Sequence, residues 1–83
     1  MVNIKDFRKI MASIISNNIK AERARSGMSQ QEVAEKLNIA TRTYIRWEQN
    51  PNFDCIDLLF LANLFNCKTD DFYLGIDTTK CGI

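Results

Sequence analysis

The stretch MSQQEVAEKLNIATRTYIRWEQN, from Met28 to Asn50, decides the fold of this sequence. It opens with Ser29 and Glu32 at capping-box spacing, where the serine hydroxyl accepts the Glu32 backbone N–H and the glutamate carboxylate accepts the Ser29 N–H. We therefore predict a helix that starts at Gln30. Asn38 is expected to end this helix, because asparagine tolerates the left-handed conformation better than other residues with a side chain. The inward face of the helix is formed by Val33, Ala34 and Leu37.

The second half of the stretch predicts another helix, over about Thr41 to Gln49. At about 100° per residue its positions divide into two faces. The face expected to be buried carries Ala40, Thr43, Tyr44, Trp47 and Glu48. The face expected to be presented carries Thr41, Arg42, Ile45, Arg46 and Gln49. Two helices joined by a short turn have the geometry of a helix-turn-helix, whose second helix enters the DNA major groove.

The residues before this stretch predict helical structure over about Ile4 to Arg25, ended by Ser26 and Gly27. The apolar stripe of this segment turns by about 100° near positions 16–18. Either the helix breaks there, or one long helix serves two different partners.

The residues after the stretch predict a turn and two more helices, and no segment alternates as a strand would. Asp54 is expected to cap a helix over about Cys55 to Phe65, and a short helix is expected over about Asp70 to Leu74. The tail after Gly75 is expected to be disordered.

Composition excludes several classes of protein. With 83 residues, the chain is expected to form one globular domain. Its apolar runs are far shorter than the ~20 residues of a membrane span, and we predict a cytoplasmic protein with no membrane partner. Three cysteines without any histidine support neither a disulfide framework nor a zinc site, so Cys55 and Cys67 are expected in the core. Without a histidine, a metal constellation or a glycine-rich phosphate loop, we predict no enzyme and no cofactor.

Charge is distributed unevenly along the chain. Through Asn50 there are nine Lys and Arg against five Asp and Glu, or +4, and afterwards two against five, or −3. A basic half indicates a polyanionic partner, although a solvated charged face explains it equally well.

These residues resemble a known family. Ser29-Gln30-x-Glu32-Val33-Ala34-x-x-Leu37-Asn38-Ile39, followed by Tyr44, Trp47 and Glu48, resembles the Cro and phage-repressor type helix-turn-helix family of DNA-binding regulators. The resemblance covers roughly Ile15 to Tyr73. It implies an all-α fold, a five-helix bundle of the lambda-repressor-like DNA-binding type with an extra N-terminal helical segment. The single domain then comprises an extension at 1–14, a core bundle at 15–74 with its helix-turn-helix at 30–49, and a tail at 75–83.

The resemblance also implies roles for individual residues. Gln30 would contact a phosphate and buttress the recognition helix, and Arg23 and Glu48 would form a partly buried ion pair. Base-reading positions fall on Thr41, Arg42 and Arg46, and a phosphate-contacting position on Thr43.

Physical chemistry supports these roles to different degrees. An arginine that bonds bidentately to guanine discriminates by roughly 1–3 kcal/mol, so Arg42 or Arg46 is expected to read G. Ile45 either meets a thymine methyl or packs against neighbouring aliphatic stems. Tyr44 and Trp47 are expected in the core, the alternative being that they stack on single-stranded bases. Lys20, Arg25 and Lys36 either contact phosphates or are only solvated.

Two features depart from the family pattern. Ala40 stands where the family usually has a Ser or Thr cap, a loss of roughly 1 kcal/mol, so Thr41 could cap the helix instead and leave base reading. In the helix after Asp54, the residues expected to face the core are Cys55, Leu58, Leu59, Leu61, Ala62 and Phe65. A second apolar stripe, Ile56, Phe60 and Leu64, is expected to be covered by the face formed by Ile4, Phe7, Met11 and Ile14, within one chain or across a dimer.

We therefore predict a sequence-specific double-stranded DNA-binding transcriptional regulator, acting as a homodimer on an inverted repeat. The alternative is a protein-interaction module, such as a DNA-binding antitoxin or an adaptor, that binds a protein partner through the Ile56, Phe60 and Leu64 stripe. A restriction-modification controller is a further alternative within the same fold.

Overall fold

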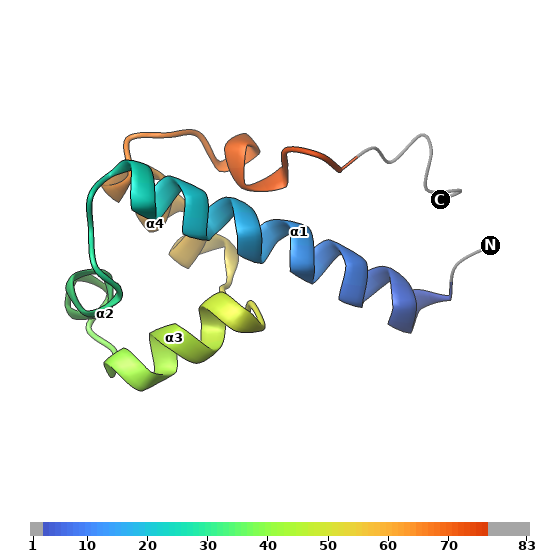
Figure 1. Ribbon diagram of the computed structural model, residues 1–83, viewed down its shortest axis with the longest axis horizontal. Coiled ribbons are helices and arrows are strands. Elements are labelled where there is room, and N and C mark those ends of the chain that lie inside the picture. The colour runs from blue at the N-terminus through green and yellow to red at the C-terminus, as the bar shows by residue number, and fades with distance from the viewer. Residues whose placement is uncertain (1–2, 77–83) are drawn as a thin grey trace.

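The computed structural model describes residues 3–76. Over this range the chain forms helices and no strand, which confirms the all-α class. The elements are α1 (Ile4–Arg25), α2 (Gln30–Leu37), α3 (Thr41–Gln49), α4 (Cys55–Leu64) and a 3₁₀ helix, η1 (Thr69–Tyr73) (Figure 1). The expected count of five helices is wrong, because the described residues form four α-helices and this 3₁₀ helix.

The last element is shorter and tighter than the expected fifth helix. In η1 the Asp71 N–H bonds to the Lys68 carbonyl at 3.0 Å, which is the i→i−3 pattern of a 3₁₀ helix. Leu74 has already left the helical conformation, with ψ 135°, and Gly75 has φ 92°. So short a segment cannot build the hydrogen-bond ladder of a stable α-helix. The predicted disorder of the tail falls mostly on residues 77–83, which lie outside the described residues.

The first helix is continuous, so the alternative of a break in its middle is wrong. Ser16 is 3% exposed and donates its hydroxyl to the backbone carbonyl of Glu48. The Asn18 amide donates to the carbonyls of Phe72 at 3.0 Å and Leu74 at 2.8 Å. Because these polar side chains bond to other elements and do not compete for the backbone of α1, the helix runs through them.

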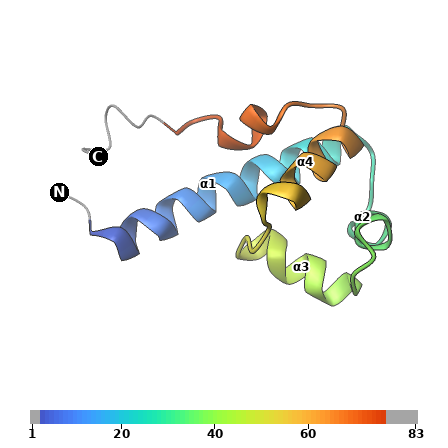
Figure 2. The same cartoon turned by 180° about the vertical axis from the view of Figure 1, so that it is seen from behind.

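The other helices gather around the C-terminal half of α1, and its N-terminal half extends beyond them (Figures 1 and 2). The core lies between this C-terminal half and the remaining elements. It consists of Ile19, Val33, Ala34, Tyr44, Leu61, Ala62, Phe65 and Phe72. None of the helices in residues 3–76 has the length and apolar character needed to cross a bilayer.

The helix α4 is buried on one side only. Leu61, Ala62 and Phe65 are buried as expected, but Cys55 is exposed and Leu59 is 55% exposed, so their assignment to the core is wrong. Nearly every side chain of α4 is apolar, so the elements packed against this helix decide which of its residues are buried.

An exposed apolar surface remains on α4, and we call it the α4 patch. It consists of Ile56, Leu59 and Phe60, which are 69%, 55% and 40% exposed. Leu64, by contrast, packs against the core. Covering of this stripe by the N-terminal face within one chain is wrong, because that part of α1 projects away and Ile4 is itself 64% exposed (Figure 1). Covering across a dimer stays a prediction.

The helix-turn-helix forms as its local signals predicted. The capping box is confirmed, with the Glu32 N–H on the Ser29 hydroxyl at 3.0 Å and the Ser29 N–H on the Glu32 carboxylate at 3.2 Å. Asn38 ends α2 in the left-handed conformation, with φ 59° and ψ 44°. Ala40 precedes α3 with no side-chain cap, so Thr41 is the first helical residue and the alternative that Thr41 is the cap is wrong.

We expect Ala40→Ser to raise the free energy of unfolding by about 1 kcal/mol, because a serine hydroxyl at this position can accept the free Thr43 N–H. Urea denaturation of both forms measures the difference. Ala21→Ser is the matched control, since Ala21 is an exposed residue inside α1, where serine costs a few tenths of a kcal/mol. Equal effects of the two substitutions would contradict the assignment of Ala40 as an empty cap.

Candidate nucleic-acid interface

One face of α3 is directed away from the rest of the protein. In Figures 1 and 2 this helix lies along the edge of the molecule opposite η1. Of the residues predicted for this face, Arg42, Arg46 and Gln49 are exposed, and Thr41 and Ile45 are half-buried. Thr43, predicted for the opposite face, is also half-buried. Within residues 3–76 neither Arg42 nor Arg46 takes part in a salt bridge. Both guanidinium groups are therefore free to bind a ligand.

The opposite face of α3 is anchored by a buried carboxylate. The Glu48 side chain is 0% exposed and accepts from the Arg23 guanidinium at 2.6 and 3.3 Å. It also accepts from the Tyr44 hydroxyl at 2.6 Å and from the Gln30 amide at 3.0 Å. The predicted ion pair of Arg23 and Glu48 is confirmed, and the network joins α1, α2 and α3. The Arg23 guanidinium additionally donates to the Met28 carbonyl at 3.0 Å, across the loop before α2.

The protonation states of this network are mutually consistent. Burial opposes ionisation of Glu48, but the hydrogen bonds from Arg23, Tyr44 and Gln30 outweigh it and lower the pKa of the carboxyl. The hydrogen bond to Glu48 raises the pKa of Arg23. Burial, together with the bond to Glu48, raises the pKa of Tyr44. At neutral pH Glu48 is therefore ionised while Arg23 and Tyr44 keep their protons. The carboxylate accepts from both of them and from the Gln30 amide.

Aromatic packing holds the C-terminal half of α3. Phe53, after the turn at Pro51, packs edge-on against Trp47 with ring centroids 5.2 Å apart. It also packs against Tyr44 at 6.1 Å. Tyr44 is 0% exposed, which confirms its place in the core, and Trp47 is half-buried. Tyr44 therefore has no exposed face on which a single-stranded base could stack.

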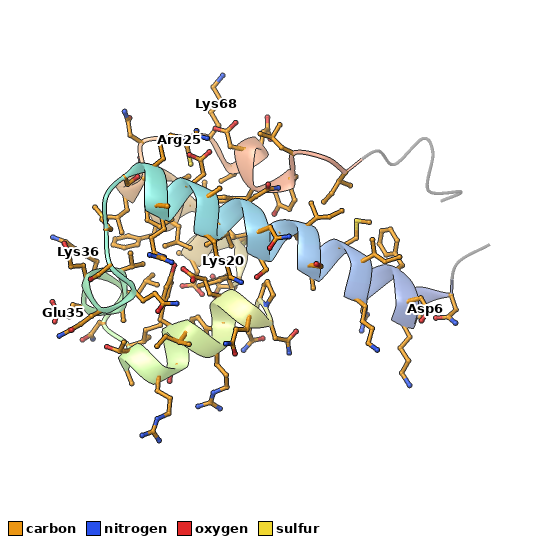
Figure 3. The ribbon with its side chains drawn as sticks, viewed as in Figure 1. Asp6, Lys20, Arg25, Glu35, Lys36 and Lys68 are labelled. Atoms are coloured by element: carbon orange, nitrogen blue, oxygen red, sulfur yellow. The ribbon has the colours of Figure 1, made fainter. Side chains whose placement is uncertain are left out.

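The three basic residues with an open role in phosphate binding lie at different distances from the presented face of α3. Lys20 lies between α1 and α3 (Figure 3) and lines a hollow together with Gln49. Arg25 lies on the side of α1 away from α3 and donates to Glu22 at 3.0 and 3.1 Å (Figure 3). Lys36 lies at the end of α2, apart from both. Only Lys20 of these three is next to the presented face.

Sequence reasoning did not assign Ser16 and Asn18 to the support of this surface. Ser16 ties α1 to the end of α3, and Asn18 ties it to η1. Their position in the sequence could have indicated this role. Both are polar residues that interrupt an apolar stripe, and no helix-breaking residue lies beside them to suggest a turn.

One cluster in the described residues has the composition of a metal site. Ligand atoms of Glu22, Cys67 and Asp71 lie within 4.8 Å of one another. The Glu22 carboxylate is already bound by Arg25. Burial, followed by the charges of Glu22 and Asp71, raises the pKa of the Cys67 thiol, which disfavours the thiolate that a metal needs. The closeness of these three side chains is therefore better explained by packing between α1 and the C-terminal segment than by a metal site.

Comparison with known proteins identifies the architecture. A family model described as helix-turn-helix matches residues 19–72. The chain belongs to this helix-turn-helix family. This confirms the resemblance to the Cro and phage-repressor type. The HTH-type transcriptional regulator ImmR of Bacillus subtilis (strain 168) is similar to this helix-turn-helix protein, with 38% identity over 66 residues. The match covers 76% of this chain and 50% of ImmR, so the chain spans about half the length of that relative. No solved structure matches the chain.

We expect Arg23→Met to lower the free energy of unfolding by about 3 kcal/mol, because it leaves the Glu48 carboxylate buried without its cation. Urea denaturation at neutral pH measures the change. Arg8→Met is the matched control, since Arg8 is exposed on the same helix and is expected to change stability by less than about 0.5 kcal/mol. Similar losses in both variants would contradict the anchoring role of the ion pair.

Proposed function

We propose that this protein is a sequence-specific double-stranded DNA-binding transcriptional regulator, with α3 in the major groove. The observation that carries the proposal is the division of α3 into two faces. One is held by the buried Glu48 network, and the other presents Arg42 and Arg46 without any salt bridge among the described residues. Membership of the helix-turn-helix family and the similarity to a transcriptional regulator support the same function.

The proposal assigns the presented residues of α3 to base reading, and Gln30 and Thr43 to phosphate contacts. Arg42 and Arg46 read base edges, with Thr41, Ile45 and Gln49 beside them in the groove. Gln30 and Thr43 contact phosphates and fix the position of the helix on the duplex. One amide hydrogen of Gln30 is engaged with Glu48, and the other remains for a phosphate oxygen. This side chain would then connect the DNA backbone directly to the anchor of α3.

The test begins with selection of bound duplexes from a random pool by the purified protein at low salt. On the selected duplex, Arg42→Ala and Arg46→Ala are each expected to weaken binding by about 5-fold to 150-fold and to relax preference at one base pair. Fluorescence anisotropy measures the affinities. Lys68→Ala is the control, because Lys68 points away from α3 (Figure 3). If no duplex is enriched, or if all three variants bind like the wild type, the proposal fails.

We further propose that the regulator is a homodimer on an inverted repeat, with a second copy of the chain on the α4 patch. One module contacts too few base pairs for useful specificity, and a two-fold axis allows the same patch to face itself. The three exposed apolar side chains of α4 support this assignment. The projecting apolar face of α1, with Ile4 exposed, is a second surface that the partner copy could meet.

We expect Phe60→Glu to shift the protein from dimer to monomer, because two carboxylates would be buried face to face in the interface. Sedimentation equilibrium measures the mass. Tyr73→Glu is the matched control, since both Phe60 and Tyr73 are aromatic and 40% exposed. A wild type that sediments as a monomer would rule out the homodimer, and co-purification of a different protein in fixed stoichiometry would assign the patch to that partner instead.

A further inference from the structure

The α1 face that packs on α3 carries basic residues along its length, from Lys20 beside α3 to Lys9 and Lys5 toward the N-terminus of α1. At about 100° per residue, Lys5, Lys9 and Lys20 lie within roughly 40° of Ser16 on the helix circumference. Ser16 is the residue whose hydroxyl binds the last turn of α3, through the Glu48 carbonyl. The same face therefore changes along the helix from a packing surface to an exposed basic surface.

Two neighbouring hollows connect this surface to α3. The first lies at the N-terminal part of α1 and is lined by Ile4, Lys5, Arg8, Lys9, Ala12 and Asn50. The second shares Lys9 and Asn50 with it and reaches Lys20 and Gln49. Because Gln49 belongs to the presented face of α3, the basic part of α1 and the proposed reading face border the same depression.

The charge along this surface is strongly positive. We call Lys5, Arg8, Lys9 and Lys20 the basic α1 face. All four are exposed, and none takes part in a salt bridge within residues 3–76. Between Ile4 and Asn18 the only acidic residue is Asp6. Unpaired cations beside a proposed DNA-reading helix are complementary to the phosphate backbone.

A structural explanation accounts for only part of this face. Cations near a helix C-terminus are stabilised by the helix dipole, and Lys9 and Lys20 lie near the end of α3. That effect falls off within about one turn. Lys5 lies eleven residues before Ser16 in the sequence, or about 16 Å along the helix. The dipole of α3 therefore does not explain the outer members of the row.

We propose that the N-terminal half of α1 is a second DNA-binding element, which contacts phosphates flanking the base pairs read by α3. This inference rests on the proposed function. The distance from Ser16 to Lys5 corresponds to about five base-pair steps of about 3.4 Å. These residues precede position 19, where the match to the helix-turn-helix family model begins. The N-terminal half of α1 therefore adds affinity that does not depend on the DNA sequence. It also lengthens the DNA site beyond the base pairs covered by residues 19–72, which match the family model.

The experiment compares wild type with Lys5→Gln/Arg8→Gln/Lys9→Gln on the selected duplex. Glutamine keeps helix propensity, and circular dichroism checks the fold. If three phosphate contacts are lost per bound copy, the slope of log affinity against log salt falls by about 2.7 for each copy. Between about 50 and 200 mM salt, wild type then loses about 40-fold more affinity per copy than the triple variant. Lys5→Gln/Lys9→Gln is the milder variant if the triple variant is unfolded, with an expected fall of about 1.8.

Duplex length provides a second readout on the same proteins. Removing about six base pairs of flanking DNA from each end should weaken wild type and leave the triple variant unchanged. Lys68→Gln, on the side away from α3, should retain both the wild-type salt slope and the wild-type length dependence (Figure 3).

The outcomes separate this inference from the function on which it rests. Specific binding by the folded variants with the wild-type slope and length dependence overturns the inference and leaves the proposed function intact. Absence of specific duplex binding by wild type overturns both. Binding of wild type, but not of the triple variant, to phosphatidylserine vesicles, with an unchanged DNA salt slope, would assign the basic α1 face to a membrane surface and overturn the inference.

Discussion

The arrangement of the first three helices depends on the buried carboxylate of Glu48. A charge without solvent exposure is strongly unfavourable unless it is paired and hydrogen-bonded. Here the carboxylate is satisfied by Arg23 from α1, Gln30 from α2 and Tyr44 from its own helix. A rotation of α3 about its axis would break these bonds and leave the buried carboxylate without partners. The buried network on one face of α3 therefore fixes the direction in which the opposite face, with Arg42 and Arg46, points.

Features that depend on a few neighbouring residues were predictable from the sequence. The capping box at Ser29, the left-handed Asn38 and the bounds of α3 each follow from hydrogen bonds that close within about four residues. The ion pair of Arg23 and Glu48 came from the family resemblance, which carries information about distant contacts. The continuity of α1 was not decidable, because the partners of Ser16 and Asn18 lie 32 and 54 residues away.

The wrong assignments have a common physical cause. On α3 the helical wheel contrasts polar with apolar residues, and the structure follows it at Tyr44 and Glu48. On α4 there is no such contrast, so the wheel could not separate the exposed Leu59 from the buried Leu61. Charge alone similarly did not distinguish Lys20, which lies beside α3, from Arg25, which lies on the other side of α1 (Figure 3). In both cases the position of a neighbouring element decides the outcome.

The two proposed DNA contacts require different degrees of order. An arginine distinguishes bases only when its planar guanidinium is held at a defined angle, so the helix that carries Arg42 and Arg46 needs a rigid anchor. A lysine acts on a phosphate as a point charge and needs only to be near it. The N-terminal half of α1 can meet this lesser demand without being packed against the bundle. It is capped by Asn3, which accepts the Asp6 N–H at 2.9 Å, and it extends a helix already nucleated in the core. A projecting helix half of this kind is compatible with electrostatic contacts and would be unsuited to base reading.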